Sequence, residues 1–183
     1  MPTAYLNPTS DVSNSPAWSI GLGSDVYARL DGITPTGSPN LDGDVISATA
    51  SGKKCVIGFS DFDNTGVGSI NSVRAQMVTG NTARGGNYAI GMRILNSGTG
   101  SAVWAEEVVS TFASVSYRTL SWSARTTSSS GGSAWNDTDL DNIQMEIHLD
   151  SINAGTTKVT RAWFKIDYSL AATDNAIFFG TNF

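Results

Sequence analysis

The stretch "GSAWNDTDLDNIQMEIHL", residues 132–149, ends in a clear strand pattern. From Ile143 to Leu149, apolar side chains alternate with polar ones, so the segment has one apolar face and one polar face. This period of two is typical of a β-strand that buries one face, as strands of antiparallel sheets do. We therefore predict a half-buried antiparallel strand here.

The residues before this strand are rich in acids, which leaves two interpretations. They form either a metal-binding or catalytic loop, or one capped helical turn. Asn136 or Asp137 suits a helix N-cap, and Asp139 falls in the first turn, where a carboxylate stabilises the helix dipole. We favour the capped turn, with Trp135 and Leu140 packed inward over the open end of the core.

The strand period recurs along the chain, and the helix period barely appears. Gly, Asn, Asp and Ser cluster between the alternating runs, as expected for turns. About nine short strands of this kind predict an all-β fold, a single antiparallel β-sandwich or jelly roll. The stretch "AEEVVSTFA" (105–113) could instead form a short helix. The other predicted strands are "VTRAWFKIDYSL" (159–170), "NYAIGMRIL" (87–95), "INSVRAQMV" (70–78), "DVYARL" (25–30), "DVISATA" (44–50), "KCVIGF" (54–59), "SAVWAEEVV" (101–109) and "YRTLSW" (117–122).

The two ends of the chain differ from its middle. Residues 1–16 carry three prolines and no periodicity, so we predict an extended N-terminal arm beside a sandwich domain at 17–170. The C-terminal tail, 171–183, is apolar, whereas chain ends are usually polar and mobile. This tail either plugs its own sandwich or contacts a neighbouring subunit. The candidate contact residues are Ile177, Phe178, Phe179 and Phe183.

Charge and cysteine content argue against several classes of function. The net charge is −5 and the basic residues are scattered, whereas nucleic-acid binding needs clustered Lys and Arg. No apolar run approaches the roughly 20 residues of a membrane helix, and no secretory signal is visible. We expect neither nucleic acid nor membrane as a partner. The single cysteine, Cys55, lies in an apolar run, which predicts a buried thiol.

Catalytic and metal-binding constellations are missing from the sequence. The one histidine, His148, lies on the polar face of a predicted strand, which favours a surface residue over a catalytic base. The facing carboxylates of a jelly-roll glycosidase do not occur. The loop "DFDNTG" (61–66) resembles the start of a calcium site, but Asx turns explain the same residues. We therefore predict no enzyme activity, no cofactor and no metal.

Two groups of segments resemble a known class of proteins. The segments "SAWNDTDLDNIQMEI" (133–147) with "VTRAWFKIDYSL", and "INSVRAQMVTGNTARGGNYAIGMRIL" (70–95), are similar to strands of jelly-roll proteins in tailed-bacteriophage particles. The resemblance covers roughly residues 69–170. It implies a virion structural protein, and it carries no catalytic residue.

This resemblance implies two alternative functions. The first is a capsid cement (decoration) protein on the virion surface, a homo-oligomer such as a trimer, which binds and stabilises the major capsid protein after assembly in the host cytoplasm. The second is a tail- or fibre-associated jelly roll that binds a host glycan. Trp163, predicted to lie on the exposed face of its strand, is the candidate stacking residue, because sugars pack their rings against aromatic faces. The competing interpretation packs Trp163 in a second sheet or a subunit contact.

Overall fold

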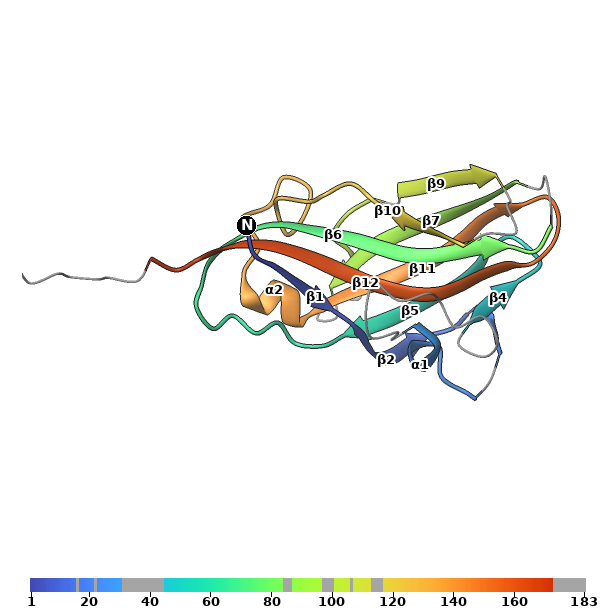
Figure 1. Ribbon diagram of the computed structural model, residues 1–183, viewed down its shortest axis with the longest axis horizontal. Coiled ribbons are helices and arrows are strands. Elements are labelled where there is room, and N and C mark those ends of the chain that lie inside the picture. The colour runs from blue at the N-terminus through green and yellow to red at the C-terminus, as the bar shows by residue number, and fades with distance from the viewer. Residues whose placement is uncertain are drawn as a thin grey trace, which may run out of the picture.

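The chain forms a sandwich of two antiparallel β-sheets, which confirms the predicted fold class (Figure 1). The computed structural model describes residues 1–15, 17–21, 23–30, 45–83, 87–96, 101–105, 107–112 and 117–172. Within these ranges each sheet has six strands. No helix in these ranges is long and apolar enough to cross a membrane.

The first sheet is built around the two longest strands. Strand β12 pairs along most of its length with β6, with register shifts at three places. β12 also pairs with β4 at one end and with β1 at the other. The order is β10 (Arg118–Ser121), β6 (Val67–Asn81), β12 (Thr157–Leu170), β4 (Ile46–Ala48) and β3 (Ser19–Ile20), with β1 (Thr3–Leu6) added on β12.

The second sheet is centred on β11, the strand predicted from residues 142–150. β11 pairs with β5 on one side and with β7 on the other. The order is β2 (Pro8–Ser13), β5 (Lys53–Phe59), β11 (Ile143–Ile152), β7 (Asn87–Asn96) and β8 (Ser101–Ala102), with β9 (Glu107–Phe112) also on β7.

The core lies between the two inner faces and follows the alternation read from the sequence. In β11, Met145, Ile147 and Leu149 are fully buried, and the residues between them are partly exposed. Phe59 and Phe164 meet across the sheets edge to face, with 4.7 Å between ring centroids. The alternation fails at the end of β12, where Leu170 is 65% exposed because two register shifts precede it.

The acidic stretch forms the predicted helical turn. Helix α2 (Asp137–Asp141) begins after the N-cap Asn136, whose side-chain oxygen accepts from the Asp139 backbone N–H at 3.0 Å. The Asp139 carboxylate accepts in return from the Asn136 N–H at 3.2 Å, which completes a capping box. Trp135 and Leu140 join the core at this end of the sandwich, as predicted.

Two local predictions are wrong, each for a tertiary reason. The predicted strand at 25–30 contains helix α1 (Tyr27–Leu30) instead. The carboxylate of Asp11 in β2 accepts from the N–H groups of Val26 and Tyr27, at 2.8 and 2.7 Å, and so satisfies the donors at the start of this turn. Where the alternative helix at 105–113 is described by the structure, residues 107–112 form a strand, β9, because the edge of β7 offers backbone partners there.

The first residues are extended, as predicted, but they are not an arm separate from the sandwich. β1 pairs with β12 in the first sheet, and β2 pairs with β5 in the second. The N-terminal segment therefore joins both sheets, and residue 16 does not mark a boundary of the sandwich. The predicted contact residues Ile177, Phe178, Phe179 and Phe183 lie outside the described residues.

Candidate functional site

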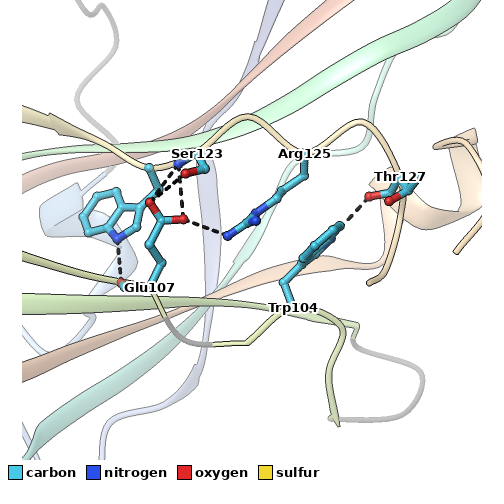
Figure 2. A network of polar contacts seen from close by, with 6 residues as sticks. Trp104, Glu107, Ser123, Arg125 and Thr127 are labelled. Carbon is cyan, nitrogen blue, oxygen red and sulfur yellow. Dashed lines mark hydrogen bonds and ion pairs between the residues drawn. The ribbon is translucent and has the colours of Figure 1, made fainter. Parts of the chain in front are cut away.

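A polar network joins β9 to the segment that follows β10. Figure 2 shows Arg125 reaching towards Glu107, with the ring of Trp104 beside it. Arg125 Nη2 lies 2.7 Å from Glu107 Oε2, and the guanidinium carbon lies 4.4 Å from the centroid of the Trp104 ring. The Glu107 carboxylate also accepts from the backbone N–H and hydroxyl of Ser123. These contacts hold the segment against the edge of the second sheet.

The network fixes the orientation of Trp104. Its indole N–H donates to the Thr127 carbonyl at 3.2 Å, and Arg125 covers one part of the ring. A cation–π contact of this kind contributes about 1 kcal/mol at a partly exposed site. Trp104 remains partly exposed to solvent. It is therefore a partly exposed aromatic side chain that packs against the core and is held in one orientation.

The loop after Thr127 is held by its own hydrogen bonds. Residues 127 and 134 form an antiparallel bridge, and Ser130 N–H donates to the Val103 carbonyl at 3.2 Å. Gly131 has a φ of 73°, a left-handed conformation that glycine adopts without strain. The sequence "SSSGGS" (128–133) therefore forms a tight turn whose backbone is bound to Val103, the neighbour of Trp104.

A hollow of about 180 Å³ lies between this loop and α2. Its apolar lining comes from the end of β7, the start of β11 and the Trp135 ring, and its polar lining includes the hydroxyls of Ser128 and Ser129. Val103, the neighbour of Trp104, also lines it. The remaining lining residues are Ile94, Leu95, Asn96, Asp139 and Ile143.

Asp139 is the charged residue of this hollow. Its Oδ2 accepts from the backbone of Asn136, and its Oδ1 has no hydrogen-bond partner among the described residues. The helical turn therefore positions this carboxylate through the same bond that caps the helix. An acceptor that is fixed by the fold and still available can bind a hydroxyl or amine of a ligand.

Trp135 separates this hollow from a second one. Its ring is 5% exposed, and its indole N–H donates to the Arg125 carbonyl at 2.9 Å. The second hollow, of about 250 Å³, is lined by Trp135, the start of β6 and the first residues of the α2 turn. Asn64 and Asp137, which both line it, are hydrogen-bonded to each other. Because its amide and carboxylate are already paired, we take the first hollow, together with Trp104, as the candidate site.

Trp163 is not on an exposed surface, contrary to the prediction. Its side chain is on the outer side of the first sheet but only 6% exposed, and its indole N–H donates to Gln76 Oε1 at 3.0 Å. Gln76 in turn donates to Ser121 at 2.7 Å, so three neighbouring strands share the contact. A ring buried to this extent offers no open face to a sugar, and a glycan role for Trp163 stays an untested prediction.

The other singled-out residues have structural partners. Asp63 Oδ1 accepts from the Thr65 N–H at 3.0 Å, which is the predicted Asx turn, and bonds from the side chain and backbone of Thr65 lower the pKa of Asp63. His148 is partly exposed on β11, as expected. Burial raises the pKa of the Cys55 thiol, which is fully enclosed as predicted. Among the described residues, no three His, Cys, Asp or Glu side chains form a group that could hold a metal.

Sequence reasoning missed the residues of the Figure 2 network. Trp104 and Glu107 lie in a stretch predicted as strand, and Arg125 lies in an aperiodic stretch with no motif. Trp104 and Arg125 are 21 positions apart in the sequence, so only the packing of the segment after β10 against β9 brings them together.

Comparisons with known proteins show similarity at the level of the fold. No family model and no curated protein matches the chain. A family 11 carbohydrate-binding module from Clostridium thermocellum, in complex with a β-1,3-1,4-mixed-linked tetrasaccharide, is 15% identical with a TM-score of 0.37, over 70% of this chain and 76% of that chain. The N-terminal cellulose-binding domain of Cellulomonas fimi β-1,4-glucanase C is 12% identical with a TM-score of 0.36, over 79% and 86% of the two chains.

A third solved structure of similar score is an enzyme. It is a Stig cyclase from Fischerella, 7% identical with a TM-score of 0.35, over 75% of this chain and 82% of that chain. Scores and identities this low carry no argument about function, and the same β-sandwich architecture hosts unrelated activities. The function has to be argued from the site.

Proposed function

We propose that this β-sandwich is a glycan-binding protein whose site is the hollow beside Trp104. The observation that carries the proposal is a hollow lined by a serine-rich turn and the Asp139 carboxylate, with a partly exposed, oriented tryptophan next in the chain to one lining residue, Val103. Sugars present an apolar C–H face and a rim of hydroxyl groups. An aromatic ring with polar groups beside it matches both features.

The site is organised before any ligand binds. The Trp104 ring is held by Thr127 and Arg125, the turn is held to Val103, and Asp139 is held by the helix cap. Binding loses affinity when side chains must be ordered, so a site held in this way loses less. The hollow is smaller than the roughly 300–1,000 Å³ of pockets that enclose a drug-sized molecule. It suits one sugar unit of a longer chain, with further units lying across Trp104.

A glycan array followed by titration calorimetry tests this proposal. We expect Trp104→Ala to weaken binding of the selected glycan roughly tenfold, because it removes the stacking surface. Trp104→Phe should retain most of the affinity. Tyr5→Ala, which removes an aromatic side chain that is 44% exposed on β1 in the first sheet, is the matched control and should not change binding. Absence of binding to any glycan, or full binding by Trp104→Ala, would overturn the proposal.

The proposal includes no chemical step. The three acids of α2 each accept a hydrogen bond: Asp139 from the Asn136 N–H, Asp137 from the Asn64 side-chain amide, and Asp141 from the Phe62 N–H at 3.1 Å. None of these contacts is that of a carboxylate oriented by a second acid for glycoside cleavage. Release of reducing ends from a glycan that the protein binds would contradict this part of the proposal.

A glycan-binding role is compatible with the virion location that the sequence resemblance implies. A tail or fibre protein would use the site to contact a host surface. The capsid cement role, with the major capsid protein and further copies of this chain as partners, rests on the resemblance alone. Adding purified protein to heads that lack it distinguishes the two: a cement protein binds and raises their thermal stability, and a glycan-binding tail protein does neither.

A further inference from the structure

We propose that the hollow selects sugars by charge, accepting neutral sugars and amino sugars and rejecting acidic ones. This inference rests on the proposed function and names the class of glycan. The lining residues of the hollow include a single charged side chain, Asp139, and no Lys, Arg or His. A ligand carboxylate or sulfate would therefore meet a negative charge and no cation.

Further acids surround Asp139 within the same turn. Asp137 and Asp141 precede and follow it by two residues, and α2 contains no basic residue. Asp63 lies in the adjoining loop, whose Asn64 is hydrogen-bonded to Asp137. The turn and the adjoining loop therefore carry acids only, and these add to the repulsion of an anion that enters the hollow.

Arg125, the cation of the network around Trp104, already has two partners. Arg125 is paired with Glu107 at 2.7 Å and stacked on Trp104 at 4.4 Å. Acidic sugars are normally held by an arginine fork or a lysine, and turning Arg125 towards a ligand would break both contacts. Asp139 Oδ1, in contrast, can accept from a hydroxyl or from a protonated amine, and the amine adds an ionic contribution.

The test uses four hexasaccharides of equal length: β-linked glucose, N-acetylglucosamine, glucosamine and a uronic acid. They are titrated near pH 6 at low and at high salt. For the wild-type protein we expect the neutral and amino oligomers to bind and the uronate to bind at least tenfold more weakly than the better neutral oligomer. High salt should reduce the difference in affinity between the amino oligomer and the neutral oligomers, because screening weakens the interaction between exposed charges.

Asp139→Asn is the decisive variant because it removes the charge and retains an oxygen that can cap α2. We expect roughly fivefold weaker binding of the glucosamine oligomer and stronger binding of the uronate, with a smaller loss for the neutral oligomers, which lose a hydrogen-bond acceptor but no ionic contribution. Asp150→Asn is the matched control, since Asp150 is an exposed acid on β11 several residues beyond its α2 end. It changes the net charge equally and should leave all four affinities unchanged.

The outcomes separate this inference from the proposed function. If the uronate binds as well as the neutral oligomers, or if Asp139→Asn and Asp150→Asn behave alike, charge selection is wrong while glycan binding stands. If no oligomer binds and the wider array is also negative, both proposals fail. A thermal melt of Asp139→Asn, expected within a few degrees of the wild type, shows that the cap is retained.

Discussion

Two tryptophans of this protein each donate an indole hydrogen bond but differ in exposure. Trp163 lies in the middle of β12 and is 6% exposed, with its indole N–H bound to the Gln76 side chain. Trp104 lies in an irregular segment between β8 and β9, is partly exposed, and has its indole N–H bound to a backbone carbonyl. Both residues lie in stretches predicted as strand, but Trp163 is buried in a regular strand and Trp104 is partly exposed in an irregular segment.

The comparison shows what strand periodicity can and cannot indicate. An alternating pattern assigns Trp163 to the outer face of its sheet, but it does not say whether that face is covered. Trp104 is accessible because the chain at the end of the sandwich is irregular, and irregular segments carry binding residues more often than the strands that position them. Trp163 should therefore contribute mainly to stability, and Trp104 mainly to binding.

The largest expected effect is on the stability of Trp163→Ala. Removing a buried indole leaves a cavity and an unpaired Gln76 oxygen, so the free energy of unfolding should fall by roughly 3 kcal/mol. Urea unfolding followed by circular dichroism measures this loss of unfolding free energy. The loss should be smaller for Trp163→Phe. Trp104→Ala should lower the free energy of unfolding clearly less than Trp163→Ala does. The reverse order would show that Trp163 is not the more important of the two for stability.

The second effect concerns the contacts of Arg125, which orient the Trp104 ring. Arg125→Ala removes the ion pair with Glu107 and the contact with the Trp104 ring, and should cost about 1–2 kcal/mol of unfolding free energy. Arg125→Lys should retain only part of this unfolding free energy, because lysine lacks the planar guanidinium. A double-mutant cycle with Glu107→Gln should show coupling of roughly 1 kcal/mol. Additive effects would mean that the two side chains do not stabilise each other.

The third effect tests the cap that positions Asp139. Asn136→Ala removes the side-chain acceptor at the start of α2 and should lower the free energy of unfolding by about 1 kcal/mol. Asn136→Ser, which restores an acceptor, should stay close to the wild type. Because Asn136 and Trp163 share no hydrogen-bond partner among the described residues, the losses of Asn136→Ala and Trp163→Ala should add within about 0.5 kcal/mol.

The smallest effect is a pH dependence in the sheet that contains Trp163. Desolvation acts to raise the pKa of Asp167, but hydrogen bonds from Thr3, Lys165 and Ser72, with the charge of Lys165, outweigh it and lower the pKa below its usual 3.8. The stability from this carboxylate is therefore fully present above pH 3.8 and is lost as the pH falls through the lowered pKa.

Asp167→Asn should consequently make the stability of the protein less dependent on pH below about 4. Thermal melts of the variant and the wild type between about pH 5 and 2 measure this difference. Asp150→Asn, which removes an exposed charge outside this hydrogen-bond group, is the control. Equal slopes for Asp167→Asn and the wild type would show that the contacts with Thr3 and Ser72 do not stabilise the ionised form.

The central strands were predictable because the alternation of apolar and polar side chains along each strand matches which side chains are buried. In β11, the alternation of Met145, Ile147 and Leu149 with polar residues corresponds directly to one buried face. The capped turn before it was predictable for the same local reason, since Asn136 and Asp139 satisfy each other's backbone donors. The turn at Asp63 is also local, with its partner only two residues away.

The errors occurred where distant groups decide the local structure. Residues 25–30 resemble a strand, but the Asp11 carboxylate satisfies two amide donors and a helical turn begins there. The N-terminal residues show no periodicity because β1 and β2 are short strands in two different sheets, and each takes its conformation from a partner far along the chain.

The sequence by itself determined the all-β class, the strands at the centre of both sheets, the capped turn of α2 and the burial of Cys55. Each of these features depends on the hydrophobic period of the sequence, on its composition, or on contacts between residues a few positions apart. Only the tertiary structure decided that Trp163 is covered, that Trp104 is partly exposed, that Arg125 pairs with Glu107, and that Asp139 lines a hollow. The exposure of a side chain and the grouping of residues from separate segments depend on how the sheets pack, and no local pattern encodes that packing.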